Sequence, residues 1–283
     1  MLHLSFFDEP TVLGAPYIIA EIGSNWQTKE DCLKSIELIG GTEADAVKFQ
    51  LFTHEALYGY PGTMPGELNP AWLPDLYSCA IKNGLMFMCS AFSTELIRAV
   101  NPYVRVHKLA SAEITHLDML DTLNEIGKPV LVSTGGASKE QVDTARSKLS
   151  KCKVCFMYCV PAYPATSTDW KDLEAYHEGF SDHSLDLFVI PSGPSPWRFE
   201  VIEKHVNPLG IVSPDYSTSL SLLQFKAMAL RLKGYMKAVS ADEIHRDANH
   251  DMHRFHQRRK LPGKDGYYRL KSSDSLFSRD SHP

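Results

Sequence analysis

The chain has 283 residues, of which 43% are hydrophobic and 22% are charged, and its net charge is -5 at pH 7. This composition is typical of a soluble globular protein with a large core, and the negative charge argues against a general nucleic-acid-binding role, because such proteins neutralise phosphates with basic surfaces. No window approaches the roughly 20 apolar residues of a membrane helix, and the N-terminus lacks a secretion signal. We therefore expect a cytoplasmic protein without membrane partners, with its six cysteines reduced.

Short apolar runs recur along the chain, and most are separated by segments with helical periodicity. Each run ends in polar residues that are able to do chemistry. We predict strands at 17–21, 46–50, 85–90, 104–108, 129–133, 155–159, 180–182 and 201–205. Eight strands alternating with helices predict an α/β fold, the TIM (β/α)8 barrel, whose active site lies at the carboxyl ends of the strands. We call that open end the mouth.

The helices are predicted from their apolar stripes and capping residues. They cover 28–39, 72–82, 94–100, a segment lined by Leu117, Leu120 and Leu123, 138–149, and a closing segment with Leu220, Leu223, Ala227 and Leu230 on one face.

Three segments break this alternation. Residues 58–70 are rich in Gly and Pro, and we expect an irregular excursion able to act as a lid over the mouth. Three prolines within 190–199 predict a short or displaced helix after the seventh strand. From residue 234 the chain becomes polar, so we divide it into an N-terminal segment (1–14), a barrel (15–233) and a loosely ordered tail (234–283). The histidines of that tail fit a solvated face better than a metal site.

Polar residues at the strand tips are expected to share the barrel interior, since residues two apart in a strand point the same way. Lys48 and Lys108 would then lie with hydroxyl groups in a cradle for a phosphate or carboxylate. The hydroxyls belong to Ser90, Ser111, Ser133 and Ser181. The alternative is that the two lysines merely pair with Glu21 and Glu113.

His183 and His205 end the seventh and eighth strands. Two imidazoles on neighbouring strands are able to hold one divalent ion and leave the rest of its coordination to substrate and water, with Glu203 and Asp182 as orienting groups. The alternative is a pair of hydrogen-bonded core histidines. His107 is expected to point away from Lys108, toward the helical shell.

Eight short motifs with these residues appear in order and together resemble the N-acetylneuraminate (sialic acid) synthase family over residues 15–233. They are AEIGSN with Glu21 and Asn25, DAVKFQ with Lys48 and Gln50, KLASAE with Lys108, Ser111 and Glu113, PVLVSTG with Ser133, YP at Tyr163 and Pro164, SDHS with His183, IEKH with His205, and SPD with Asp215.

The resemblance implies a carbon–carbon bond-forming transferase of carbohydrate biosynthesis. Such an enzyme condenses phosphoenolpyruvate with an N-acylated amino sugar of the N-acetylmannosamine type, giving phosphate and a nine-carbon 2-keto sugar acid such as sialic acid. It implies a divalent metal, most often Mn2+ with Mg2+ or Co2+ as alternatives, on His183 and His205. The catalytic residues would be Glu21, Lys48, Lys108 and Glu113, and the substrate-binding residues would be Gln50, Ser90, Phe92, Ser111, Ser133, Tyr163, Ser181 and Asp215.

Departures from the family pattern occur at Trp26, on either the sugar side or the phosphate side, and at Pro161, near the sugar. The family's C-terminal antifreeze-like domain is expected to be missing or reduced to the tail. Pairing of two subunits into a homodimer is left open. Two other functions also stay open: a phosphoenolpyruvate aldolase that acts on a phosphorylated aldose, and a barrel that binds ligand without turnover.

Overall fold

The computed structural model describes residues 3–4, 10–11, 15–165, 177–186 and 199–238 of the chain, and the side chains of the last range through residue 234. The chain divides into a compact unit, Met1–Tyr235, and a second unit, Met236–Pro283. The account below concerns the first of these. Within the described residues, no helix is long and apolar enough to cross a membrane.

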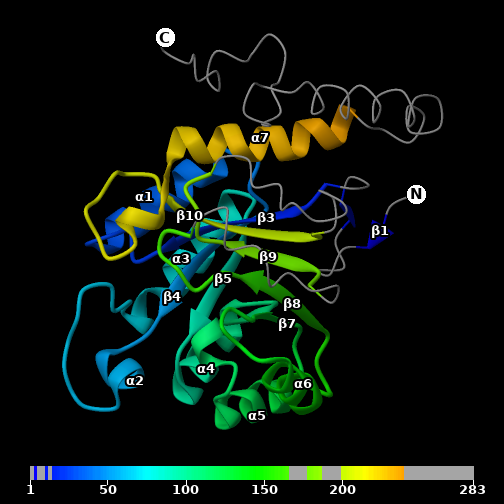
Figure 1. The fold of residues 1–283 in the computed structure, drawn as a ribbon. Helices are drawn as coiled ribbons and strands as arrows, with labels where there is room; N and C mark the ends of the chain where they lie inside the picture. Colours follow the sequence, from blue (N-terminus) through cyan, green and yellow to red (C-terminus); the bar gives the residue numbers. More distant parts are fainter. Residues whose placement is uncertain (1–2, 5–9, 12–14, 166–176, 187–198, 239–283) are drawn as a thin grey trace, which may run out of the picture. The chain divides into compact units, whose positions relative to one another are not determined.

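The first unit is built on a closed barrel of parallel strands (Figure 1). Each strand is hydrogen-bonded to the next in chain order, and the last strand also pairs with the first, which closes the barrel. The strands are β3 (Tyr17–Gly23), β4 (Ala46–Leu51), β5 (Met86–Ala91), β6 (His107–Leu109), β7 (Val130–Ser133), β8 (Val154–Cys159), β9 (Gly179–Asp182) and β10 (Val201–Asn207). The predicted TIM barrel is confirmed.

Helices follow most of these strands and cover the outside of the barrel (Figure 1). They are α1 (Lys29–Gly40), α2 (His54–Tyr58), α3 (Leu73–Lys82), α4 (Thr94–Val100), α5 (Leu117–Ile126), α6 (Lys139–Lys148) and α7 (Leu222–Ala238). Thr28 and Ser138 begin α1 and α6 with complete capping boxes, in which side chain and backbone cap each other. These caps explain why both helices start where the sequence predicts.

Shorter elements complete the unit. Short 3-10 helices are η1 (Pro70–Trp72), η2 (Asn101–Tyr103), η3 (Ser111–Glu113) and η5 (Tyr216–Thr218). Strands β1 (His3–Leu4) and β2 (Pro10–Thr11) form an antiparallel pair, and β11 (Leu220–Ser221) extends the sheet from β10.

Strand β6 is shorter than the predicted 104–108. It begins only at His107, and residues 104–106, which follow η2, do not belong to the strand. The ammonium of Lys128 donates to the carbonyls of Asn101 at 2.6 Å and Val104 at 2.8 Å, so these groups bond to a side chain instead of a neighbouring strand. His107 points into the shell, where its ring lies 3.1 Å from the Asn101 amide, as predicted.

One predicted helix face is right at two of its three leucines, and a second predicted face is wrong. In α5, Leu117 is 49% exposed, while Met119, Leu120 and Leu123 are buried. In the closing segment, Leu220 belongs to β11, and Leu223 and Leu230 are 77% and 47% exposed. The buried face of α7 is instead formed by Phe225, Met228 and Ala229. Helix α7 carries more apolar residues than its contact face holds, so leucine spacing alone selected the wrong side of this helix.

The barrel interior is filled in two layers. The layer nearest the amino ends of the strands is apolar and consists of Tyr17, Ile19, Ala46, Met86, Met88, Val106, Leu131, Cys155, Met157 and Val201. A separate, larger apolar cluster lies between the strands and the helices. Because interior side chains alternate along a strand, the next inward positions toward the mouth lie directly above the apolar layer. These positions carry the polar site.

The excursion after α2 is anchored beside the mouth. Gly66 has φ +90°, and a Cβ there would lie 2.8 Å from Cβ of Ser24 and 3.2 Å from the ring of Phe52. Glycine is therefore required for this close approach to the loop after β3. Lid closure by the excursion stays a prediction. Residues 190–198 and the tail beyond residue 238 lie outside the described residues, although α7 itself continues past residue 233.

Candidate active site

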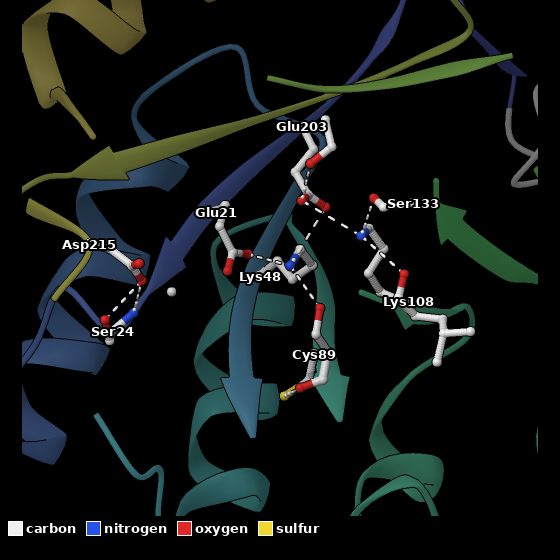
Figure 2. A network of polar contacts seen from close by, with 12 residues as sticks. Glu21, Ser24, Lys48, Cys89, Lys108, Ser133, Glu203 and Asp215 are labelled. Carbon is white, nitrogen blue, oxygen red and sulfur yellow. Dashed lines mark hydrogen bonds and ion pairs between the residues drawn. The ribbon is translucent and has the colours of Figure 1, made fainter. Parts of the chain in front are cut away.

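The polar layer consists of inward-facing side chains at the carboxyl ends of seven strands. All are buried: Glu21, Lys48, Ser90, Lys108, Ser133, Ser181, Glu203 and His205. Strand register explains why they meet, since Glu21 is the direct partner of both Lys48 and His205, and Ser90 is the partner of Lys108. The predicted convergence of ammonium, carboxylate, hydroxyl and imidazole groups on one end of the barrel is therefore observed. Figure 2 shows the two lysines with Glu21, Glu203 and Ser133.

Lys48 lies between two carboxylates (Figure 2). Its Nζ is 2.7 Å from Oε2 of Glu21 and 3.6 Å from Oε2 of Glu203, and it donates a hydrogen bond to Oγ of Ser90 at 2.9 Å. Burial works against the charged amine, but the two carboxylates outweigh it and raise the pKa of Lys48. Lys48 is therefore a permanent cation.

Lys108 has a different environment. It donates to Oγ of Ser133 at 2.8 Å, and its nearest carboxylate oxygen, Oε1 of Glu203, is 3.9 Å away. Burial dominates here and lowers the pKa of Lys108, with Glu203 acting in the opposite direction. Of the alternative pairings, Lys48 with Glu21 is observed, whereas Lys108 faces Ser133 and Glu203 instead of Glu113. Lys108 is thus the less compensated of the two ammonium groups.

Glu203 is the shared counter-ion of the site, a role that we did not predict. We expected it to orient a metal ligand, but it faces both lysines and accepts a hydrogen bond from Oγ of Ser181 at 2.9 Å. Burial alone would raise its pKa, yet the charges of Lys108 and Lys48 lower the pKa of Glu203 to about 2. The sequence did indicate that Glu203 faces the interior, because it lies two residues before His205 in β10 and residues two apart in a strand point the same way.

The pKa of Glu21 is shifted in the opposite direction to that of Glu203. Its side chain is completely buried, and burial raises the pKa of Glu21 to about 7, with Lys48 opposing the shift and Glu203 adding to it. Near neutral pH this carboxyl group therefore exchanges between its acid and base forms. Such a group is suited to proton transfer.

His183 and His205 lie side by side at the mouth, with ring centroids 5.5 Å apart. Nδ1 of His183 is 2.8 Å from the carbonyl of Val160, which can only accept, so Nδ1 carries the proton and Nε2 keeps a lone pair. Nδ1 of His205 is buried and has no hydrogen-bond partner within the described part of the chain. Burial lowers the pKa of both rings, that of His183 to about 3, so both are neutral at pH 7. Neutral imidazoles are metal ligands.

Tyr163 and Asp215 flank the histidines. The Tyr163 ring stacks on His183 with a centroid distance of 4.1 Å and remains 57% exposed, so it reaches from the buried layer toward the opening. Asp215 Oδ2 accepts hydrogen bonds from the backbone N–H and from Oγ of Ser24, both at 2.8 Å (Figure 2). A Cβ on Gly23, whose φ is +56°, would lie 2.2 Å from that oxygen, so this contact requires glycine at residue 23.

Four predicted site residues lie outside the charged layer. Gln50 follows Lys48 on the inward face of β4 and is the strand partner of Ser90, and Phe92 packs edge-on against Phe52. Glu113 belongs to η3, where burial raises its pKa and His116 opposes the shift. Within the described ranges, no hydrogen bond or ion pair joins these residues to Lys48 or Lys108, so their roles stay predictions.

Ser111, the fourth of these residues, reaches the site through a cysteine. Its Oγ donates to Sγ of Cys159 at 3.5 Å, and that sulfur is 3.6 Å from Nδ1 of His183. Cys159 was not among the predicted site residues. Burial raises its pKa, so the group is a thiol.

Asp182 does not orient a metal ligand directly. It points to the outer face of the barrel and forms an ion pair with Lys204, its partner across β9 and β10. Within the described residues, no group of three or more His, Cys, Asp and Glu side chains is placed to hold a metal ion.

A closed parallel barrel whose strand tips gather buried lysines, carboxylates and imidazoles has the organisation of a barrel enzyme. Residues 60–243 match the NeuB family, and the chain belongs to this family. The predicted family relationship is confirmed.

Relatives of the chain include several sugar-acid synthases. It is 28% identical over 246 residues to the spore coat polysaccharide biosynthesis protein SpsE of Bacillus subtilis, covering 75% of this chain and 65% of that protein. It is 25% identical over 267 residues to pseudaminic acid synthase of Helicobacter pylori, covering 82% and 78%. The chain thus spans about two thirds to three quarters of these relatives.

Solved structures show the same fold. The N-acetylneuraminic acid synthetase of Leptospira borgpetersenii, solved in complex with citrate, superimposes with a TM-score of 0.70 at 23% identity, covering 88% of this chain and 93% of that chain. SpsE of Bacillus subtilis gives a TM-score of 0.67 at 24% identity, covering 82% of this chain and 70% of that chain.

Proposed function

We propose that the chain is a carbon–carbon bond-forming transferase that condenses phosphoenolpyruvate with an N-acylated amino sugar. The products would be a nine-carbon 2-keto sugar acid and inorganic phosphate. The observation that carries the proposal is the meeting of two buried ammonium groups with two neutral imidazoles in one polar layer. The names of the relatives, which include pseudaminic acid and N,N'-diacetyllegionaminic acid synthases, support it.

Lys48 and Lys108 would bind the anionic groups of phosphoenolpyruvate. Their ammonium groups already donate to Ser90 and Ser133, so the cations and hydroxyls are held in place before the ligand arrives. Fixed donors in a site without bulk water stabilise a leaving phosphate without reorganisation. Lys108, the less compensated cation, is the stronger candidate for direct phosphate contact.

Glu21 would manage a proton. An incoming anion adds negative charge beside Lys48, which favours the protonated form of a carboxyl group whose pKa is already about 7. Glu21 would then release the proton, or accept one from water, as C3 of the enol attacks the sugar aldehyde and water adds at C2. Glu203, with its pKa lowered to about 2, stays an anion throughout and holds the lysines in place.

The two imidazoles fit a divalent ion, and we propose Mn2+, with Mg2+ or Co2+ as substitutes. The lone pair on Nε2 of His183 and the unpartnered Nδ1 of His205 supply the observations behind this fit. When bound, such an ion polarises a carbonyl oxygen and orients a water molecule. Tyr163, stacked on His183 and exposed, would contact the sugar acceptor, together with Gln50 and Asp215. Ser111 would belong to the phosphoenolpyruvate cradle, Glu113 would assist Glu21 in proton transfer, and Phe92 would bind substrate.

Phosphate release from phosphoenolpyruvate tests the proposal. The purified chain is incubated with a panel of N-acylated amino sugars, with and without Mn2+, and with free and phosphorylated aldoses side by side. Release that requires both an N-acylated amino sugar and a divalent ion is expected, with loss of activity in H183A. Release with phosphorylated aldoses instead would identify the aldolase alternative. Thermal stabilisation by phosphoenolpyruvate without release for any sugar would identify a binding barrel and contradict the proposal.

A further inference from the structure

A second charged cluster lies on the outer face of β9 and β10, on the opposite side of these strands from the polar layer. Lys204 is completely buried, although it lies between Glu203 and His205, which face the interior. Asp182 is its direct strand partner, and it lies between Ser181 and His183. A buried lysine on the shell side of a barrel is costly unless its charge is fully satisfied. Its surroundings show how this is achieved.

The ammonium group of Lys204 is enclosed by one turn, residues 182–186. It pairs with the carboxylate of Asp182 and donates to the carbonyls of Ser184 at 2.5 Å and Asp186 at 3.1 Å, with Oγ of Ser184 at 3.2 Å. Carbonyl and carboxylate oxygens only accept, so all three ammonium hydrogens are used. A hydrogen bond within the turn stabilises it further: Oδ1 of Asp182 accepts a hydrogen bond from the Ser184 N–H at 2.8 Å.

His183 lies inside this turn, and its backbone is held from the other side as well. The His183 carbonyl accepts hydrogen bonds from Oγ1 of Thr218 at 2.9 Å and from the Ala165 N–H at 3.0 Å. The ammonium of Lys204 therefore supplies the contacts on one flank of His183. Because Lys204 is also adjacent to His205 in β10, one cation connects the backbone segments that carry both imidazoles.

We propose that Lys204 is a positioning residue that fixes the 182–186 turn and thereby sets the relative placement of His183 and His205. Without the ammonium, two carbonyls and a carboxylate that is 2% exposed lose their donor, and the turn must rearrange to reach water. The inference rests on the proposed function only in taking a divalent ion as the ligand of the imidazoles. Groups that hold metal-binding side chains in place typically affect metal affinity about 10- to 100-fold.

The test uses Mn2+ affinity of the full chain, measured from the free-ion electron paramagnetic resonance signal, beside unfolding by denaturant. K204M is expected to weaken Mn2+ binding about 10- to 100-fold. D182N/K204M removes the uncompensated carboxylate and is expected to recover most of the stability but not the affinity. K233M is the matched control: it breaks the ion pair of Lys233 with Asp45, 2.7 Å long, between α7 and the start of β4, and should lower stability while leaving Mn2+ affinity unchanged.

A second readout does not depend on metal. Hydrogen–deuterium exchange of the metal-free chain over residues 182–186 should accelerate in K204M and in D182N/K204M, but not in K233M. Wild-type affinity in the double variant, or unchanged exchange in this turn, would overturn the inference. If the wild-type chain binds no Mn2+, the metal part of the proposed function fails, and the exchange experiment alone decides whether Lys204 holds the turn.

Discussion

Oε1 of Glu203 lies 3.9 Å from Nζ of Lys108, and neither side chain exposes more than 4% of its surface. Because Lys48 lies on the other oxygen of the same carboxylate, at 3.6 Å, one anion serves two buried cations. The stability and the chemistry of the barrel mouth are therefore linked through this group.

Replacing Glu203 by Gln should destabilise the chain strongly. The isosteric change leaves two ammonium groups with less compensation, and breaking a buried pair in this way costs about 3–5 kcal/mol. The folded-state pKa of about 2 lies below the ordinary 4.5, so this stabilisation is present above pH 4.5 and is lost as the pH falls toward 2. Urea unfolding of wild type and E203Q at pH 7 and pH 3 measures it. E37Q, in the exposed pair with Lys34, is the control and should stay within about 0.5 kcal/mol.

Glu21 should give the opposite pH dependence. Its folded-state pKa of about 7 exceeds the ordinary 4.5, so between these values the folded state holds a proton that the unfolded state has released. The contribution of this group to stability is therefore present below pH 4.5 and declines as the pH rises through 7, by up to about 3 kcal/mol. Denaturant unfolding of wild type and E21Q from pH 4.5 to 8 should show this slope only in wild type. Parallel curves would contradict the assignment.

The two lysines should be separable by substitution with Met. Both K48M and K108M are expected to lower kcat/KM for phosphoenolpyruvate about 10²- to 10³-fold, since each removes a fixed donor. K48M should destabilise the chain more than K108M, because Lys48 lies 2.7 Å from Glu21 whereas the nearest carboxylate to Lys108 is 3.9 Å away. Steady-state kinetics and thermal unfolding measure the two effects. Equal stability losses would show that the lysines are equivalent.

Substitution of Tyr163 should weaken binding of the sugar acceptor without changing the stability of the fold. Its ring is 57% exposed and stacks on His183, so Y163A is expected to raise KM for the amino sugar while stability changes by no more than about 0.5 kcal/mol. Y163F keeps the ring and isolates the hydroxyl. Kinetics with the amino sugar varied at saturating phosphoenolpyruvate measure this effect, and an unchanged KM in Y163A would place the acceptor elsewhere.

Gly23 and Gly84 form a matched pair for testing the Asp215 contact. Both have positive φ, +56° and +72°, so alanine at either position carries a conformational cost of about 1–2 kcal/mol. Only at Gly23 does the new Cβ meet an atom, Oδ2 of Asp215 at 2.2 Å, whereas nothing lies within 4 Å at Gly84. G23A should therefore be the more destabilising and should alone reduce activity. Equal losses in unfolding free energy would mean that the loop moves freely.

The strands and most helix starts could be predicted because local signals agree with the final structure. Period-two alternation placed Lys48, Lys108 and His205 on the interior, and side-chain caps at Thr28 and Ser138 marked helix starts. The closeness of the two imidazoles followed from the barrel architecture, since neighbouring parallel strands end at the same rim.

The side-chain contacts of the site could not be predicted, because they depend on which groups share a counter-ion. Strand alternation places Glu203 inside the barrel, but only the three-dimensional structure shows that its carboxylate faces two lysines instead of the histidines. The same holds for Lys204, which alternation places on the outer face of β10, toward the apolar helical shell. Its burial follows from the turn at 182–186, and no local pattern marks a turn that encloses an ammonium group. The predicted buried face of α7 was wrong for a related reason, since tertiary packing selects among several apolar stripes.

The barrel closes by pairing β10 with β3, so Glu21 and His205 become strand partners although 184 positions separate them in the sequence. On the ribosome, a nascent chain lacking β10 carries Lys48 and Lys108 without Glu203. The emerging intermediate therefore has Glu21 as the counter-ion of Lys48, leaves Lys108 without the carboxylate that faces it, and has an open seam between β9 and β3. Folding of the barrel is consequently expected to finish in a late, all-or-none step, in which β10 supplies the counter-ion of Lys108 and closes the barrel together.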